Sequence, residues 1–134
     1  MAYWLVKSDP DSYGWEEMKK DKKTDWDGVR NYQARNNLRE MKKNDLVLFY
    51  HSQSDKAVMG ITQVTKEAYQ DPTTDDDRWV AVELKYKKAL KNPVTLKQIK
   101  SEESLGDVAL IRHTRLSVMP ITEEEFEKIV ELGK

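Results

Sequence analysis

Three strand-like segments follow one another in the middle of the chain with no helix between them, and this order constrains the fold most. Residues 46–50 are continuously apolar, which is typical of a strand buried on both faces. Residues 58–64 form a second predicted strand, and residues 79–87 alternate between apolar and polar side chains, as in a strand with one wet face. Successive strands of this kind favour an α+β fold with a mostly antiparallel sheet.

Shorter elements flank these strands. The sequence predicts a strand at residues 3–6, a helix at 15–20, a charged loop at 19–23, a helix from Asn31 or Tyr32, and a last strand at 115–119 that Pro120 ends. Thr95 with Gln98 and Thr122 with Glu125 form capping boxes that open two further helices. About five short strands in one domain, residues 1–134, predict a small β-barrel with flanking short helices.

Composition excludes several classes of protein. The chain has no cysteine, so it has neither disulfides nor cysteine-ligated metals. No apolar run reaches transmembrane length and the N-terminus lacks a signal peptide's pattern, so we expect no membrane partner and a cytoplasmic, or in a eukaryote nuclear, monomer. Charged residues make up 35% of the chain but the net charge is only -1, so any contact with nucleic acid must be local.

The segment from Trp26 to Met41 carries the strongest functional signal. It combines aromatic rings, amides and guanidinium groups, a mixture that suits a nucleobase and its phosphates. Trp26 is the expected stacking wall, because Asp27 and Gly28 beside it predict a turn at the rim of a pocket. The alternative is a core tryptophan with no ligand.

Five stretches resemble the EVE domain family: YWLVKSDP at residues 3–10, WDGVRNYQARNNL at 26–38, FYHS at 49–52, GI at 60–61 and RLSV at 115–118. The resemblance covers nearly the whole chain. It implies a PUA-like barrel related to YTH and ASCH domains, and recognition of modified bases such as 5-methylcytosine and its hydroxymethyl form. Asp9, Gly14 and the pair His113–Thr114 depart from the usual family pattern, but none lies in the 26–38 motif.

We therefore expect a non-catalytic reader that needs no cofactor and binds DNA or RNA carrying a modified base. The residues expected to bind the base are Lys7, Ser8, Trp26, Val29, Asn31, Tyr32, Asn36, Tyr50, His51, Ser52 and Gly60, and those expected to bind phosphates are Arg30, Arg35, Arg112 and Arg115. Structural alternatives stay open for several of them. Asn31 suits a helix N-cap, the serines suit turn capping, Gly60 suits a bulge, and Arg35 suits a solvated helix face.

Catalysis and metal binding have weaker support in the sequence. His51 and His113 are the only histidines and lack ligand spacing, so no metal site is expected. His51 and Ser52 are adjacent and would point to opposite faces of a strand, which disfavours a nucleophile–base pair. Three rivals to a DNA reader remain: a reader of modified RNA, an ASCH-like hydrolase of a modified cytidine that uses Lys7, and a protein-interaction module that uses the acidic last helix.

Overall fold

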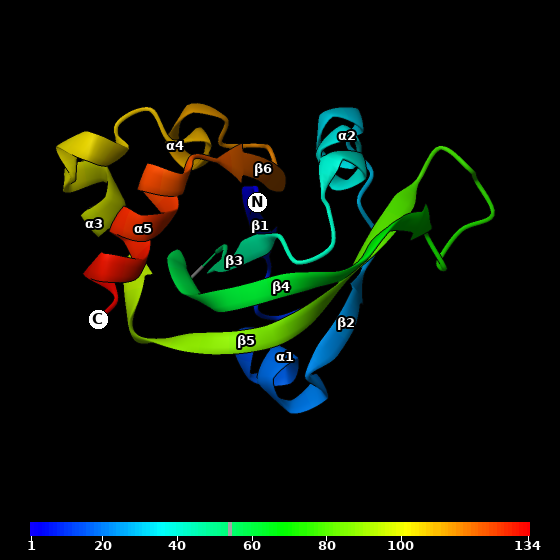
Figure 1. The fold of residues 1–134 in the computed structure, drawn as a ribbon, viewed down its shortest axis with the longest axis horizontal. Helices are drawn as coiled ribbons and strands as arrows, with labels where there is room; N and C mark the ends of the chain where they lie inside the picture. The colour runs from blue at the N-terminus through cyan, green and yellow to red at the C-terminus, as the bar shows by residue number, and fades with distance from the viewer. Residues whose placement is uncertain (54) are drawn as a thin grey trace.

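The computed structural model describes residues 1–53 and 55–134, and it shows one curved sheet with short helices around it (Figure 1). The elements are β1 (Tyr3–Ser8), α1 (Trp15–Asp21), β2 (Lys23–Trp26), α2 (Tyr32–Glu40), β3 (Leu46–His51), β4 (Ala57–Gln70), β5 (Val80–Thr95), α3 (Leu96–Ser101), the 3-10 turn η1 (Glu103–Leu105), α4 (Ala109–Arg112), β6 (Val118–Ile121) and α5 (Glu123–Leu132). Within these residues the strand order is β2-β5-β4-β3-β1-β6. Only β1 and β3 pair in parallel, which confirms the predicted α+β class with a mostly antiparallel sheet.

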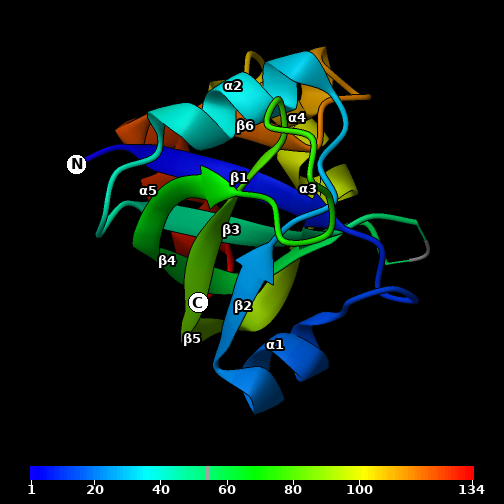
Figure 2. The ribbon, with the colours of Figure 1, turned by 90° about the vertical axis from the view of Figure 1, so that its right-hand side faces the viewer.

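Strands β4 and β5 form a long hairpin that gives the sheet its curvature. They span 14 and 16 residues, far more than the predicted segments, and their pairing register shifts at several points, one of them between Val58 and Gly60. Such bulges bend a strand and increase its twist. The pair therefore curls under the other strands and carries its tip outward beside α2 (Figures 1 and 2). The sheet remains open in the described part of the chain, with β2 and β6 as its edges.

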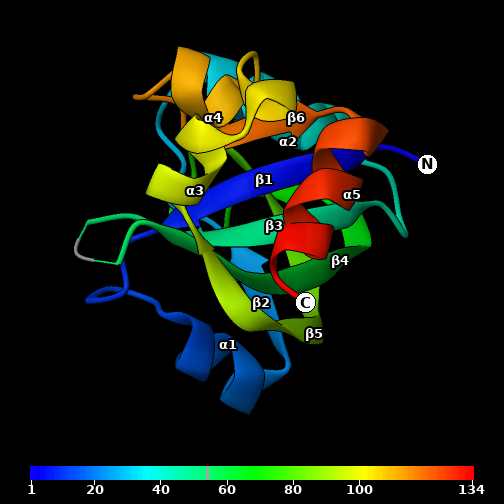
Figure 3. The same cartoon turned by 90° about the vertical axis from the view of Figure 1, so that its left-hand side faces the viewer.

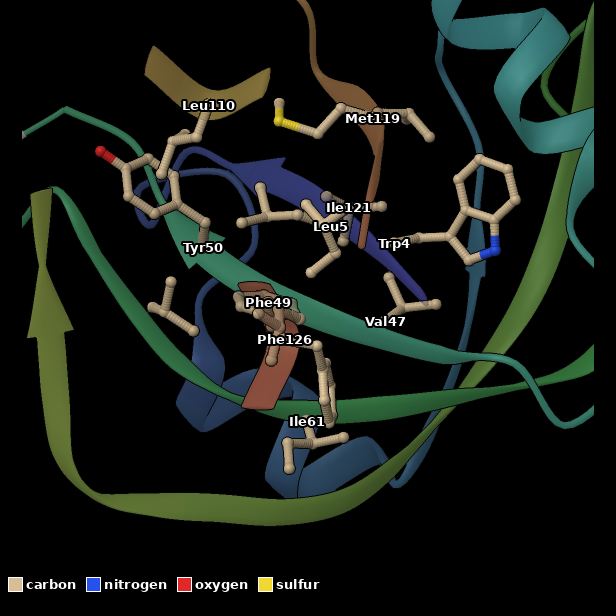
Figure 4. Packing of buried hydrophobic residues seen from close by; sticks show 14 of the residues in the cluster. Trp4, Leu5, Val47, Phe49, Tyr50, Ile61, Leu110, Met119, Ile121 and Phe126 are labelled. Atoms are coloured by element: carbon tan, nitrogen blue, oxygen red, sulfur yellow. The ribbon is translucent and has the colours of Figure 1, made fainter. Parts of the chain in front are cut away.

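The core lies where β1, β3 and β6 meet the helices of the C-terminal half. Leu5 and Met119 are fully buried there, and α3, α4 and α5 cover this side of the strands (Figures 3 and 4). Phe49 is fully buried on the opposite face of β3, where it packs against Trp15 and Trp26. Residues 47–51 of β3 are all buried, because this strand is covered on both faces, as its apolar sequence predicted. The buried Asp45 carboxylate is satisfied by the Trp4 indole N–H at 3.0 Å and by two backbone N–H groups, so it closes the turn before β3.

Side-chain caps start three of the helices as the sequence predicted. Asn31 precedes α2, and its side-chain oxygen accepts a hydrogen bond from the Ala34 N–H at 2.9 Å. Thr95 and Thr122 open α3 and α5, each in a complete capping box. No helix of the described residues is long and apolar enough to cross a lipid bilayer.

Two local predictions were wrong. Residues 19–23 are not one charged loop, because α1 continues to Asp21 and β2 begins at Lys23, where it pairs with β5. Pro120 does not end the last strand but lies inside β6, opposite Trp4. A proline is tolerated there because β6 is an edge strand, so the missing N–H has no partner to lose.

Gly60 is required by the packing of Trp15. A Cβ added at Gly60 would overlap the Trp15 ring and lie 2.8 Å from the Lys88 carbonyl oxygen. The Trp15 ring packs on Phe49, opposite Gly60 in the sheet, with 5.1 Å between the ring centroids. The close approach that the glycine signals therefore comes from the protein's own indole.

We expect Gly60→Ala to destabilise the protein by about 1–3 kcal/mol, because overpacking forces neighbouring groups to move. Thermal unfolding measures the effect. Gly106→Ala is the control, since a Cβ at this helical position meets only the Glu103 carbonyl oxygen at 3.4 Å. Equal melting temperatures for the two variants would contradict the role assigned to Gly60.

Candidate functional site

A cavity of about 520 Å³ opens beside the end of β1. Its walls come from residues 7–9 and 12–13 at the end of β1, from residues 24–30 in and after β2, and from Ser117 just before β6. The volume lies within the range of roughly 300–1,000 Å³ that is usual for small-molecule sites. Three segments distant in the sequence thus meet at one hollow.

Trp26 and Tyr13 are the aromatic residues that line this cavity. Trp26 is the last residue of β2 and only 8% exposed. Its ring meets Phe49 edge to face, with 5.5 Å between centroids, and Tyr13 in the same way at 6.5 Å. Edge-to-face contacts hold an aromatic ring in one orientation. Trp26 is therefore both a core residue and a cavity wall, so the two readings of the sequence are compatible.

The loop after Trp26 is held by the buried carboxylate of Asp71, at the end of the β4–β5 hairpin. One carboxylate oxygen accepts hydrogen bonds from the Gly28 N–H at 2.8 Å and the Arg30 guanidinium at 2.9 Å, and the other accepts from the Thr73 N–H at 2.7 Å. Gly28 has a φ of 75°, a backbone conformation that favours glycine. Residues 27–30 can therefore line the cavity only while the hairpin tip stays docked.

At Asp71, burial raises the pKa by less than hydrogen bonds lower it. Burial alone would raise the pKa of this carboxyl, but the bonds from Thr73, Arg30 and Gly28 lower it to about 2. The side chain is fully buried, and because its pKa is about 2 it is ionised at neutral pH. Sequence analysis did not single out Asp71. The Asp-Pro-Thr turn that it opens is visible locally, but its contact with Gly28, 43 residues away, is not.

The polar groups of the cavity offer both donors and acceptors. The Lys7 ammonium donates to the Thr114 carbonyl at 2.7 Å, and burial lowers its pKa. The Ser8 hydroxyl donates to the Tyr13 carbonyl. Asp25 accepts from the Tyr69 hydroxyl. Burial first, and then the nearby carboxylates of Asp71 and Asp25, raise the pKa of Asp27.

Of the residues expected to bind the base, Lys7, Ser8, Trp26 and Val29 line this cavity. Asn31 is occupied as the cap of α2 and faces a neighbouring hollow of about 290 Å³. Tyr32 is 52% exposed and stacks on Trp79, with 5.1 Å between centroids. Asn36 is exposed and accepts hydrogen bonds from Arg35, so Tyr32 and Asn36 lie outside the cavity wall.

The other expected base-binding residues support the site from behind. His51 is buried, accepts a hydrogen bond from the Trp15 N–H at 2.9 Å, and lies 2.9 Å from Asp55, which places its proton on Nδ1. Ser52 donates to the Ser8 carbonyl, and Tyr50 is 3% exposed beside Leu110 in the core (Figure 4). His51 and Gly60 contact Trp15 at the start of α1, and Ser52 bonds to the end of β1, whereas Tyr50 belongs to the core. None of these four residues lines the cavity.

The four arginines expected to bind phosphates differ in how free they are. Arg30 pairs with Asp71, and Arg112 pairs with Asp107 at 2.6 Å. Arg35 bonds to Asn36 and the Arg78 carbonyl and lies over the Tyr32 ring. Arg115 is exposed in the hollow next to Asn31, and within the described residues it has no ion pair. In the same part of the chain, no cluster of three metal-binding side chains occurs.

Comparison with known proteins gives the family. The profile of the EVE domain matches residues 2–132. This chain belongs to the EVE domain family. Mouse thymocyte nuclear protein 1 is 35% identical, with 97% of this chain and 73% of that protein aligned.

Solved EVE structures share the whole fold. Protein Atu2648 from Agrobacterium tumefaciens superposes with a TM-score of 0.95 at 40% identity, covering 99% of this chain and 93% of its own. Human THYN1, in complex with 5-methylcytosine containing DNA, superposes with a TM-score of 0.90 at 32% identity, covering 100% and 98%. The YTH domain of Mmi1 reaches a TM-score of 0.60 at 15% identity, which shows a common fold alone. The predicted family and its PUA-like architecture are confirmed.

We expect Asp71→Asn to lower the melting temperature at neutral pH. The folded-state pKa of about 2 lies below the ordinary 3.8, so the carboxylate stabilises the fold above pH 4 and loses this effect as the pH falls from 4 to 2. A shift of this size is worth about 2 kcal/mol. The difference in melting temperature between wild type and variant should therefore shrink over that pH range.

Asp75→Asn is the matched control, because Asp75 is exposed in the same loop. It should melt like the wild type at each pH. A gap between wild type and Asp71→Asn that stays constant from pH 6 to pH 2 would show that the charge of Asp71 does not hold the loop.

Proposed function

We propose that this EVE-domain protein is a non-catalytic reader that takes one modified base, of the 5-methylcytosine type, into the cavity beside Trp26. The observation that carries the proposal is the pairing of an aromatic-walled cavity with the fold of human THYN1, which was solved with 5-methylcytosine containing DNA. A base enters such a cavity only when it is unpaired or flipped out of a duplex. The cavity volume leaves room for a base and part of its sugar.

The lining chemistry suits a cytosine. Trp26 supplies an aromatic wall, and a stacked base gains about 1–3 kcal/mol from such a contact. Carboxylate oxygens accept hydrogen bonds from the exocyclic amine of cytosine, and Asp25 and Asp27 both line the cavity. The Ser117 hydroxyl can accept or donate, while the Ser8 hydroxyl, which donates to the Tyr13 carbonyl, can accept. In this proposal the polar edge of the base faces these groups.

The added methyl group contributes little by itself. A buried methyl-sized group is worth about 0.8 kcal/mol, which corresponds to about fourfold in affinity. Val29 and the Tyr13 ring are the apolar surfaces of the cavity that could cover it. We therefore expect modest discrimination between modified and unmodified cytosine. Paired DNA and RNA oligonucleotides of the same sequence test which polymer is preferred, because the answer depends on contacts to the 2′-hydroxyl.

A hydrolase remains a second candidate because Lys7 and Asp9 line the same cavity and burial lowers the pKa of Lys7. Lys7 therefore lies beside a carboxylate in the cavity, and its ammonium loses a proton more readily than that of a free lysine. Incubation with free modified nucleosides, followed by chromatography, tests this function. Product that disappears in Lys7→Met would favour the hydrolase, and binding without turnover would favour the reader.

We expect Ser12→Trp to abolish the preference for a modified base by filling the cavity. Ser12 is exposed at the mouth, so the fold should melt as in the wild type. Fluorescence anisotropy with oligonucleotides that differ by one 5-methyl group measures the change, and we expect affinity for the modified strand to fall at least tenfold. Trp26→Ala should lower it by about 5–100-fold through lost stacking, though it also removes core packing.

Ser104→Trp is the matched control, since Ser104 is an exposed serine far from the lining residues. It should bind both oligonucleotides as the wild type does. If Ser12→Trp also keeps wild-type affinity and discrimination, the base does not enter this cavity.

A further inference from the structure

A second hollow, of about 420 Å³, lies where α1, β2 and β5 meet, and lysines dominate its lining. Lys19 and Lys22 come from the end of α1, Lys23 opens β2, and Lys85 reaches the same hollow from β5. The half-buried ring of Tyr86 completes the lining and packs on Trp15 behind it. Four lysines thus line one hollow, mainly through their aliphatic stems, in a chain whose net charge is only -1.

The ammonium groups of these lysines are free of intramolecular partners. Within residues 1–53 and 55–134, none of the four lysines takes part in an ion pair. The nearest carboxylates on the same strands are engaged elsewhere: Asp25 accepts from Tyr69, while Glu83 accepts from Thr65 and pairs with Lys66. The four lysines around this hollow are therefore not neutralised by ion pairs within the described residues.

The pairing of β2 with β5 places two of these lysines against each other. Lys23 lies directly opposite Lys85, so both side chains project from the same face of the sheet. Like charges in directly opposed positions destabilise an antiparallel pair. Asp25 and Glu83 form the next opposed pair on that face, so opposite charges meet only on the longer diagonals. The arrangement is unfavourable for stability and favourable for binding an anion.

Lys22 has a backbone conformation that costs stability. It ends α1 with a φ of 68°, a conformation in which glycine or asparagine is usual. Residues whose backbone conformation is unfavourable for their type, with no structural gain, are expected at functional sites. The opposed lysines and the lysine at positive φ both cost stability, and the opposed pair is the feature that favours an anionic ligand.

Strand β2 connects the lysines to the candidate base cavity. Lys23 lines the lysine hollow, whereas Thr24 and Trp26 line the cavity. Three residues of a strand span about 10 Å, which matches the rise of about three stacked nucleotides. In Figure 2, β2 rises from the end of α1 to the loop beyond Trp26, along the open edge of the sheet. A polynucleotide that contacts both hollows would pass around this edge strand, because Lys23 and Trp26 project from opposite faces of it.

We propose that Lys19, Lys22, Lys23 and Lys85 bind the sugar–phosphate backbone of the nucleic acid whose base enters the cavity. This inference rests on the proposed reader function and adds a contact surface to it. The arginines expected from the sequence to hold phosphates are largely engaged, since Arg30 and Arg112 are already paired with carboxylates. The unpaired lysines supply the sequence-independent part of the affinity.

The test compares Lys23→Gln and Lys85→Gln, singly and together, with the wild type. Binding of methylated and unmethylated oligonucleotides is measured by anisotropy over a range of salt concentrations. Each substitution should weaken both oligonucleotides by the same factor, about three- to tenfold, and leave their ratio unchanged. The slope of log K against log salt should fall in magnitude by about 0.7–0.9 per lysine. Melting temperatures should rise by about 1–4 °C, since like-charge repulsion is removed.

The double variant Lys97→Gln/Lys100→Gln is the control, because it removes the same charge from exposed positions of α3. Affinity that is unchanged in the β2–β5 variants, or that falls as much in the control, would overturn the proposal. A loss of affinity together with a lower melting temperature would also overturn it, because damage to the strand pairing would explain both. A wild type that binds without preferring the methylated strand, yet depends on Lys23 and Lys85, would support this surface and refute the reader function.

Discussion

The structure depends on the fully buried ring of Phe49. In the middle of β3 it packs against Trp15 and Trp26, with 5.1 and 5.5 Å between ring centroids, and against Tyr13 and His51 further out. This one ring joins the start of α1, the end of β2 and the loop after β1 to the sheet. Aromatic groups packed edge to face restrict one another's orientation. The candidate cavity is therefore built on the core itself, and its Trp26 wall cannot move independently of the fold.

Another part of the cavity wall, residues 27–30, is held by the carboxylate of Asp71. Asp71 binds the loop of Gly28 and Arg30 to the tip of the β4–β5 hairpin, and Trp79 and Tyr32 stack just beyond it. The same ion pair that builds this wall removes Arg30 from the set of free cations. Charge used to shape the site is thus unavailable to bind a phosphate, and the binding of a polyanion falls to groups without partners.

Besides Arg115, such unpaired cations gather around the start of β2, where local stability and charge conflict. The opposed pair of Lys23 and Lys85 and the positive φ of Lys22 both cost stability. They occur where α1 and β5 meet the start of β2, the short edge strand that ends in Trp26. An edge strand tolerates such conflicts more easily than a central strand, because it has one paired neighbour. In our interpretation, the lysine hollow and the cavity beside Trp26 form one binding surface, because both are lined by residues of β2.

The sequence by itself determined the elements whose signals are local. The apolar run of β3 and the caps at Asn31, Thr95 and Thr122 all follow from neighbours within a few residues. The resemblance of the 26–38 motif also gave the family. The short strand β2, the position of Pro120 in an edge strand and the length of the β4–β5 hairpin were missed, because pairing partners far along the chain create them.

Only the tertiary structure decided which candidate residues meet. It brought Lys7, Ser8, Trp26 and Val29 to one cavity, and it placed Tyr32, Asn36, Tyr50, His51, Ser52 and Gly60 around or behind it. It also paired Arg30 with Asp71 and left Lys23 facing Lys85. The reason is physical: a residue type states what a side chain can bind, but whether that capacity is already used depends on partners that folding brings from distant parts of the chain.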